Sequence, residues 1–389
     1  METQQPDRLF TPAFITLTLS ELAYFTAAGL IIGVTPFFVT GPLGSSEAGL
    51  GVVAAAFSIT TLLLRPYAGR LSDRRGRRPL LIGGALLCAA VLLGHLVATS
   101  MVVLVGLRLL LGVAEAFFFV AGFAALADLA PRGRTGEALS YNSLALYLGI
   151  ALGPIAGQVL LDAGGFGWAW MGGFVLAAIA AGLAVRLPET AARLEPDAPA
   201  PPLFHRAAIG PGLALFTGVA AMSAFLLLAG PRAERIGLDG WSLTFLLFGG
   251  VVVACRIAFA RLPDRVPPRV LGAAALALAA IGLSITAILP GVPALLAGSA
   301  ILAVGVAFMT PALFAATFNV VPPSERGAAA GTASLFIDLG FGIGPLVAGL
   351  IAAGGGIPAA FAAAAGVAAL GALGTAVAPR LARTASPVG

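Results

Sequence analysis

The sequence predicts an all-α integral membrane protein with twelve transmembrane helices, arranged as two pseudo-symmetric halves of six. The composition is apolar: 59% of the residues are hydrophobic, 10% are charged, and the mean hydropathy is +1.01. Apolar stretches of about twenty residues recur along the chain, the length that crosses a hydrocarbon core as a helix. The alternating ten-residue segments of a membrane barrel are not visible. Finally, the second half of the chain repeats the pattern of apolar stretches and charged residues found in the first half.

The apolar stretches define the expected helices in order. Each stretch is long enough to satisfy its own backbone hydrogen bonds within the bilayer, which only a helix or a closed barrel can do. The predicted spans are 11–38, 47–66, 79–99, 101–127, 137–161, 168–186, 208–229, 241–260, 270–288, 293–318, 327–351 and 358–378.

The first span is expected to be a helix of the mature protein. No basic segment precedes it and Glu21 interrupts it, which argues against a cleaved signal peptide. The third and eighth spans contain the two cysteines, Cys88 and Cys255, with no second Cys or His at ligand spacing. We therefore expect no disulfide and no metal site.

The arginines predict the orientation. All 22 basic residues are arginines, and basic residues gather in short loops on the cytoplasmic side. Most of them fall on that side if both termini are cytoplasmic. The net charge of +5 then reflects membrane insertion, and we expect a multi-pass protein of the inner or plasma membrane with no nucleic-acid partner.

The longest polar interruption, PETAARLEPDAPAPPLFHR, divides the chain. Its prolines and mixed charges provide too little apolar surface for folding. The sequence therefore predicts an N-terminal half over 1–187, a cytoplasmic linker over 188–206 and a C-terminal half over 207–389.

The second half repeats the first at an offset of 191 residues. One shift without gaps aligns the charged segment after the second span and the glycines of the fifth span together. The aligned pairs are Arg65 with Arg256, Arg70 with Arg261, Asp73 with Asp264, Arg74 with Arg265, Arg78 with Arg269, Gly149 with Gly340, and Gly153-Pro154 with Gly344-Pro345. We infer a duplicated six-helix unit with parallel halves.

The charged segment GRLSDRRGRR, residues 69–78, resembles the signature between helices 2 and 3 of the major facilitator superfamily. The number of predicted helices, the linker and the partly retained second copy of the charged segment extend this resemblance to the whole chain. Arg108 followed by Gly112 resembles the helix 4 motif of the proton-coupled members. GIALGPIAG, residues 149–157, resembles the helix 5 motif of exporters in the drug/proton antiporter branch, although Gln158 stands where glycine is usual. A weaker resemblance is to arabinose-efflux-like permeases.

The resemblance implies a conformational latch. Asp73 would lie against the N-terminal end of helix 11, where the helix dipole favours a carboxylate, and Arg77 would reach Asp128 at the end of helix 4. The residues assigned to this latch are Gly69, Asp73, Arg74, Gly76, Arg77, Arg78 and Asp128. A topology signal alone is the alternative, and it would explain the arginines but not Asp73.

Glycines four residues apart form a smooth stripe on the fifth helix. Such a stripe lets another helix approach closely, and a proline within it bends the helix. The stripe and its counterpart in the eleventh helix comprise Gly149, Gly153, Pro154, Gly157, Gly340, Gly344 and Pro345. We expect a seam between the halves during alternating access, with generic helix packing as the alternative.

Three acids lie inside spans, where an ionised side chain is costly. They are Glu21, Glu115 and Asp338. Arg108 precedes Glu115 by seven residues and therefore shares its helix face. Because burial favours a protonated carboxyl group, we assign proton coupling to Glu115 first, then to Glu21 and Asp338, with Arg108 as a tuning charge. A neutral packing role for one or more of these acids stays open.

The functional prediction is a proton-coupled secondary transporter, acting as a monomer, that exports a small amphiphilic or hydrophobic organic molecule by alternating access. It uses the proton gradient and needs no cofactor. The candidate cavity residues are Tyr24, Phe25, Asn142, Tyr147 and Phe341. The alternatives are a proton-coupled or passive sugar permease and a non-transporting membrane sensor. No HExxH, GxSxG or GxGxxG motif indicates an enzyme.

Overall fold

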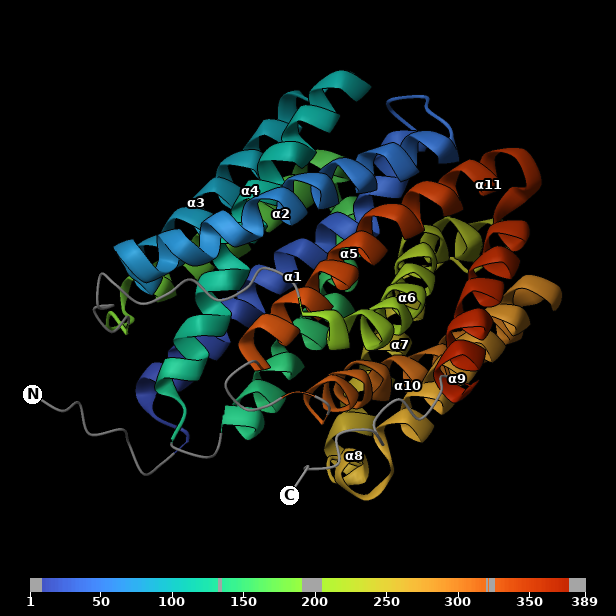
Figure 1. The fold of residues 1–389 in the computed structure, drawn as a ribbon. Coiled ribbons are helices and arrows are strands. Elements are labelled where there is room, and N and C mark those ends of the chain that lie inside the picture. Colours follow the sequence, from blue (N-terminus) through green and yellow to red (C-terminus); the bar gives the residue numbers. More distant parts are fainter. Residues whose placement is uncertain (1–8, 132–134, 191–204, 320, 322–325, 378–389) are drawn as a thin grey trace, which may run out of the picture. The chain divides into compact units, whose positions relative to one another are not determined.

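A computed structural model describes residues 9–131, 135–190, 205–319, 321 and 326–377, and these residues form helices joined by short turns, with no strand among them (Figure 1). The α-helices are α1 (Pro12–Thr40), α2 (Glu47–Arg75), α3 (Arg77–Gly94), α4 (Met101–Leu129), α5 (Thr135–Val185), α6 (Ile209–Arg235), α7 (Ser242–Ala258), α8 (Leu262–Arg265), α9 (Pro268–Ile288), α10 (Gly291–Phe318) and α11 (Arg326–Val377). Two short 3₁₀ helices, η1 (His95–Val97) and η2 (Arg206–Ala208), complete the described elements.

The predicted membrane spans correspond to these helices. Nine described segments are long and apolar enough to cross a membrane, and α7 is a shorter apolar helix. Two of the nine, Ser143–Val185 and Gly331–Val377, contain 43 and 47 residues, about twice the length of one crossing. Each is broken by non-helical glycine backbone. Divided at these breaks, and with α7 included, the described residues supply twelve crossings.

The two breaks occupy equivalent places in the repeat. Gly165 in α5 and Gly356 in α11 have φ angles of 75° and 81°, a left-handed region that glycine enters without a steric penalty. They are separated by the same offset of 191 residues that aligns the two halves. The duplication therefore extends to the turns between the fifth and sixth and between the eleventh and twelfth predicted helices.

The second helix is longer than its apolar stretch. α2 continues through Arg70 and Asp73 to Arg75, so most of the charged segment is helical, whereas the sequence predicts a loop there. No glycine or proline after Gly69 interrupts the helix before Gly76, where φ is 100°. The arginines of the last turn are also favoured by the negative end of the helix dipole.

The chain folds into two compact units. Unit 1 comprises Met1–Ala198 with Leu226–Val253, and unit 2 comprises Pro199–Phe225 with Ala254–Gly389. Leu226–Val253 therefore packs with the N-terminal part of the chain, although the repeat assigns it to the second half. The predicted halves describe a duplication in sequence, and their boundaries stay a prediction.

Candidate functional site

One face of α4 carries two charged residues of unit 1 and a glycine that contacts a third. Arg108, Glu115 and Gly122 follow one another at seven-residue intervals, which is two helical turns or about 10 Å. Arg108 is only 7% exposed, and Glu115 is half-buried. A Cβ atom placed on Gly122 would lie 2.5 Å from Oε1 of Glu21, which is 3% exposed on α1. Two of the three predicted acids thus lie along the same face of α4.

Tyr24 joins this face from α1. Its ring stacks on Phe118 with the centroids 3.9 Å apart, and the side chain is 1% exposed. Its side chain lies close to the Glu115 carboxyl group and to the Cys88 thiol. Tyr24 is buried where α1 meets α4, and its place in a substrate cavity stays a prediction.

Arg108 is bonded to a neutral group. Its Nη2 donates a hydrogen bond to Oγ1 of Thr35 on α1. Arg108 and Glu115 share a helix face, as the seven-residue spacing predicts, but no described carboxylate forms an ion pair with the guanidinium.

The third predicted acid belongs to the other unit. Asp338 is 3% exposed on α11 in unit 2, and Phe341, one turn later, is half-buried. Of the other predicted cavity residues, Phe25 and Tyr147 are buried in unit 1, and the side chain of Asn142 lies outside the described side chains. Their contact with a substrate stays a prediction.

The predicted contact between Arg77 and Asp128 is confirmed. Nε of Arg77 lies 3.3 Å from Oδ2 of Asp128, and its Nη1 contacts Oδ1 of Asp73 and donates to Oγ of Ser72 at 3.3 Å. One guanidinium therefore joins the end of α2 to the end of α4. The predicted position of Asp73 against helix 11 concerns the other unit and stays a prediction.

The remaining latch residues differ in their surroundings. Gly76 needs its positive φ to start α3 directly after α2. Arg74 is exposed. A Cβ atom on Gly69 would meet no described atom within 4 Å, so nothing in the described structure requires glycine there.

Glu189 is a residue of this cluster that the sequence does not reveal. Its carboxylate accepts hydrogen bonds from the backbone N–H groups of Arg77 at 2.7 Å and Arg78 at 3.2 Å. These N–H groups begin α3 and have no acceptor within the helix. A side chain on Gly76 would clash with Glu189, because its Cβ would lie 2.5 Å from Cδ. A single acid in a proline-rich segment has no periodicity that would connect it with α3.

Neighbouring residues extend this connection. Oγ1 of Thr190 donates to Oδ2 of Asp128 at 3.0 Å, and Nη2 of Arg78 donates to the Val185 carbonyl at 2.5 Å. The first residues after α5 are therefore bound to unit 1, although the sequence places 188–190 in a linker.

The glycine stripe of α5 packs closely on α1. A Cβ atom on Gly149 would lie 2.5 Å from the carbonyl carbon of Phe25, and one on Gly153 would lie 2.6 Å from that of Gly29. Gly157 faces α1 in the same way. The close approach that the spacing predicts is present, and its partner is a helix of the same unit. A role for the stripe in a seam between the halves stays a prediction.

The copy of the stripe in α11 packs on α6 within unit 2. A Cβ atom on Gly344 would lie 2.5 Å from the carbonyl oxygen of Ala220, and one on Gly340 would meet Val219 at 2.8 Å. Oγ of Ser223 donates to the Gly340 carbonyl at 3.0 Å. Pro154 and Pro345 lie within α5 and α11, as predicted. The stripe therefore packs on equivalent helices, α1 and α6, in the two copies of the repeat.

Gln158 binds the turn that precedes α7. Its Nε2 donates to the carbonyl oxygen of Asp239 at 3.0 Å, and its Oε1 accepts from the N–H of Ser242 at 2.9 Å. Between these two residues, Trp241 packs on Phe37 of α1 with the ring centroids 4.8 Å apart. The residue that departs from the helix 5 motif thus holds a turn by both ends of its amide group.

Two further contacts explain why Leu226–Val253 belongs to unit 1. Arg235 forms an ion pair with Glu47 at the start of α2. On α7, a Cβ atom at Gly249 would lie 2.5 Å from Cβ of Ala151.

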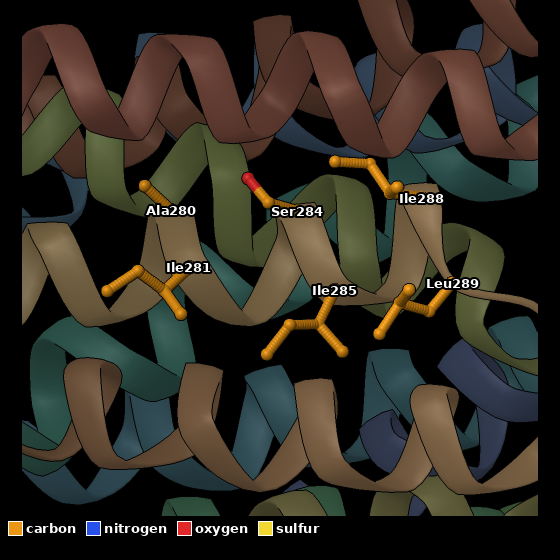
Figure 2. Close-up of a pocket in the computed structure, with 6 residues that line it drawn as sticks. All are labelled: Ala280, Ile281, Ser284, Ile285, Ile288 and Leu289. Carbon is orange, nitrogen blue, oxygen red and sulfur yellow. The ribbon is translucent and has the colours of Figure 1, made fainter.

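The pocket drawn in Figure 2 lies along α9 and offers little chemistry. Its lining contains one hydroxyl group and no charged group, and three of its apolar side chains are at least half exposed. The lining residues are Ala280, Ile281, Ser284, Ile285, Ile288 and Leu289. The polar residues that can carry a mechanism lie in unit 1 and at Asp338 instead.

Known proteins resemble the chain over most of its length. An uncharacterized MFS-type transporter of Pseudomonas aeruginosa is 32% identical over 366 residues, covering 86% of each chain. The uncharacterized MFS-type transporter YhhS of Escherichia coli is 26% identical over 373 residues, covering 92% of this chain and 90% of YhhS.

Solved structures share the fold at low identity. The human organic anion transporter MFSD10 is 20% identical with a TM-score of 0.72, covering 94% of this chain and 100% of MFSD10. The nucleoside transporter NupG is 13% identical with a TM-score of 0.77, covering 94% and 99%. The family model described as Major Facilitator Superfamily matches residues 17–292 and 257–388. With this match, the helical architecture and the charged segment beside α3, the chain belongs to the major facilitator superfamily of membrane transporters.

Proposed function

We propose that this secondary transporter is a proton-coupled exporter of a small amphiphilic or hydrophobic organic molecule, of the drug/proton antiporter type. Members of the superfamily are transporters and not enzymes. The observation that carries the proposal is Glu115, a half-buried acid on a membrane-spanning helix that lies beside the buried Tyr24. An acid held inside a span is expensive and typically serves ion or proton movement.

Glu115 is the first candidate for the proton carrier. It shares a face with Arg108, whose positive charge favours release of a proton from a nearby carboxyl group. Glu21 is the second candidate, because it lies against the same helix at Gly122. Asp338 is the third and serves either coupling or recognition of a cationic substrate.

The latch and the orientation belong to the same proposal. We place the protein in the inner or plasma membrane as a monomer with both termini in the cytoplasm, since the charged ends of α2 and α3 then face the side where basic residues gather. Asp73, Arg77 and Asp128 would stabilise one conformation of the transport cycle without touching the substrate. The contacts of Arg77 with both acids support this role.

The test combines a ligand screen with a proton measurement. A thermal-shift screen of the purified protein against drugs, sugars and lipids identifies a ligand, because binding to the folded state raises its stability. Proteoliposomes that contain a pH-sensitive dye then report proton movement when that ligand is added. We expect Glu115→Gln, which mimics the protonated acid, to abolish the proton signal while ligand binding survives. An undiminished signal would assign coupling to Glu21 or Asp338, and a sugar as the only ligand would contradict the proposed substrate class.

A further inference from the structure

A groove opens at one end of unit 2, where α8 and the start of α9 meet the end of α10. Its volume is about 380 Å³, and its lining includes Pro263, Arg265, Pro268 and Asn319. α9 begins at Pro268 and α10 ends at Phe318, and both helices are long and apolar enough to cross a membrane. The groove therefore lies where two spanning helices leave the hydrocarbon, at the level of the lipid headgroups.

The internal repeat explains why this place is open. In the first copy, Arg77 joins the end of α2 to the end of α4 through hydrogen bonds of 3.3 Å to Ser72 and to Asp128. At the offset of 191 residues, all three residues are replaced by residues that line the groove, namely Arg77 by Pro268, Ser72 by Pro263 and Asp128 by Asn319. The groove therefore occupies the place in unit 2 that the Arg77 side chain fills in unit 1.

The replacements also change the charge of this place. The acid Asp128 of the first copy becomes the neutral Asn319, and the charged side chain in the lining of the groove is Arg265. The side chain of Asp264 lies outside the described side chains. The described lining thus combines a positive guanidinium group with a neutral amide group, and both groups donate hydrogen bonds. This chemistry favours an anionic ligand with several acceptor oxygens.

Apolar side chains continue from the groove along the spanning helices. Val270 is 59% exposed on the first turn of α9. Phe314 and Phe318 lie on the last turns of α10 with their ring centroids 5.9 Å apart, and aromatic rings are common at the level of the headgroups. A ligand with an anionic head and apolar chains can therefore place its head in the groove and its chains against these helices.

We propose that the groove binds the phosphate group of an anionic phospholipid. The guanidinium group of Arg265 forms charge-assisted hydrogen bonds with phosphate oxygens, and the amide group of Asn319 donates a further bond. Basic pockets at the ends of membrane-spanning helices bind lipid headgroups in this way. The site lies in unit 2 and includes none of the acids of the proposed proton pathway, so it does not depend on the proposed export.

The test is thermal unfolding of the purified full-length protein in detergent micelles. Dioleoyl phosphatidylglycerol, dioleoyl phosphatidylcholine and inorganic phosphate are titrated separately at constant ionic strength. The two lipids have the same acyl chains, but the choline group cancels the charge of the phosphate group. We expect a saturable rise of the unfolding midpoint of about 2–5 °C with phosphatidylglycerol, and a smaller rise with the other two. An equal rise with phosphatidylcholine or with inorganic phosphate would overturn the proposal.

Arg265→Gln tests the cation of the groove. The variant keeps a hydrogen-bond donor and removes the charge, so we expect at least about five times more phosphatidylglycerol for half of the rise. Arg75→Gln is the matched control, because Arg75 is an exposed arginine at the end of α2 in unit 1. The same lipid dependence in both variants would show that the groove is not the binding site.

A double variant rebuilds the first copy inside the second. Pro268→Arg with Asn319→Asp restores the arginine and the acid that face each other in unit 1, and it leaves the net charge unchanged. We expect the restored pair to fill the groove and to abolish the response to phosphatidylglycerol although Arg265 is still present. A full response of the double variant would assign binding to the basic surface in general and contradict the groove. If the double variant does not fold, the comparison of Arg265→Gln with Arg75→Gln still decides the result.

Discussion

Tyr24 and Glu115 meet across α1 and α4, and their pairing gives the half-buried acid a defined neighbour. The hydroxyl group of Tyr24 lies near the carboxyl group, to which it can donate when that group is ionised, and its ring stacks on Phe118. A hydrogen bond to a charged group is worth about 1.5–3 kcal/mol. Tyr24 is therefore expected to position Glu115 and to share in control of its proton.

Tyr24→Phe tests this pairing. The change keeps the stacked ring and removes the hydroxyl group, so we expect pH-driven transport to fall about tenfold or more, with ligand affinity within about twofold of the wild type. Transport by proteoliposomes across a range of pH values is the measurement, and Tyr67→Phe is the control, because Tyr67 is exposed on α2. Equal transport by both variants would reduce Tyr24 to a packing residue.

The pairing also shows what residue-level prediction cannot reach. The sequence places Glu115 and Arg108 on one helix face by counting residues, and the structure agrees. The sequence does not give the rotation of α1 about its axis relative to α4. The sequence alone therefore cannot tell whether Tyr24 faces a cavity or a neighbouring helix. Glu189 was hidden for a similar reason, since its partners are backbone N–H groups that carry no sequence signal.

At the scale of elements, α5 is packed on two sides. Its glycine stripe contacts α1, and Ala151 contacts Gly249 of α7. Helices without side chains between them gain many backbone contacts at short distance, which is how membrane helices associate tightly. The spacing of the glycines predicts this close approach correctly, but not the identity of the partner.

Gly153→Leu tests the tight face of α5. A Cβ atom there would clash with the backbone of Leu30 and Thr26, and backbone cannot move aside as a side chain can. We expect a loss of at least about 1–3 kcal/mol of stability, seen as a lower unfolding midpoint and poor transport. Gly182→Leu, beyond the break at Gly165 in α5, is the matched control, because a Cβ atom placed there would meet no described atom within 4 Å. Similar midpoints for the two variants would contradict the close packing.

For the whole molecule, the sequence predicts the fold class and the internal duplication better than it predicts the ends and packing partners of individual helices. The apolar stretches and the 191-residue offset anticipate twelve crossings, and the offset even relates the break at Gly165 to that at Gly356. It does not anticipate that α2 continues to Arg75, because charged residues at a helix end look like a loop when only hydropathy is read. Nor does it place Leu226–Val253 in unit 1, because that depends on side-chain contacts such as those of Gln158.

Asp73→Asn tests the latch on the behaviour of the whole molecule. The variant removes the charge that faces Arg77 without changing the size of the side chain. We expect insertion and ligand affinity to be retained and transport to slow several-fold, because the proposed role of the latch is to bias the conformational equilibrium without touching the substrate. Asp162→Asn provides the same charge change at an exposed position of α5. Transport at the wild-type rate in both variants would leave the charged segment as a topology signal.

The carboxylate of Glu189 has a practical consequence for dividing the gene. A transporter built from duplicated halves can be co-expressed as two separate polypeptides. The gene is then divided between the last helix of one half and the first helix of the other. A cut directly after Val185 would remove both Glu189 and Thr190 from the N-terminal fragment. The first N–H groups of α3 would lose their acceptor, and Asp128 would lose a donor. A fragment that ends beyond Thr190 keeps these bonds, so the useful cut lies several residues past the end of the helix.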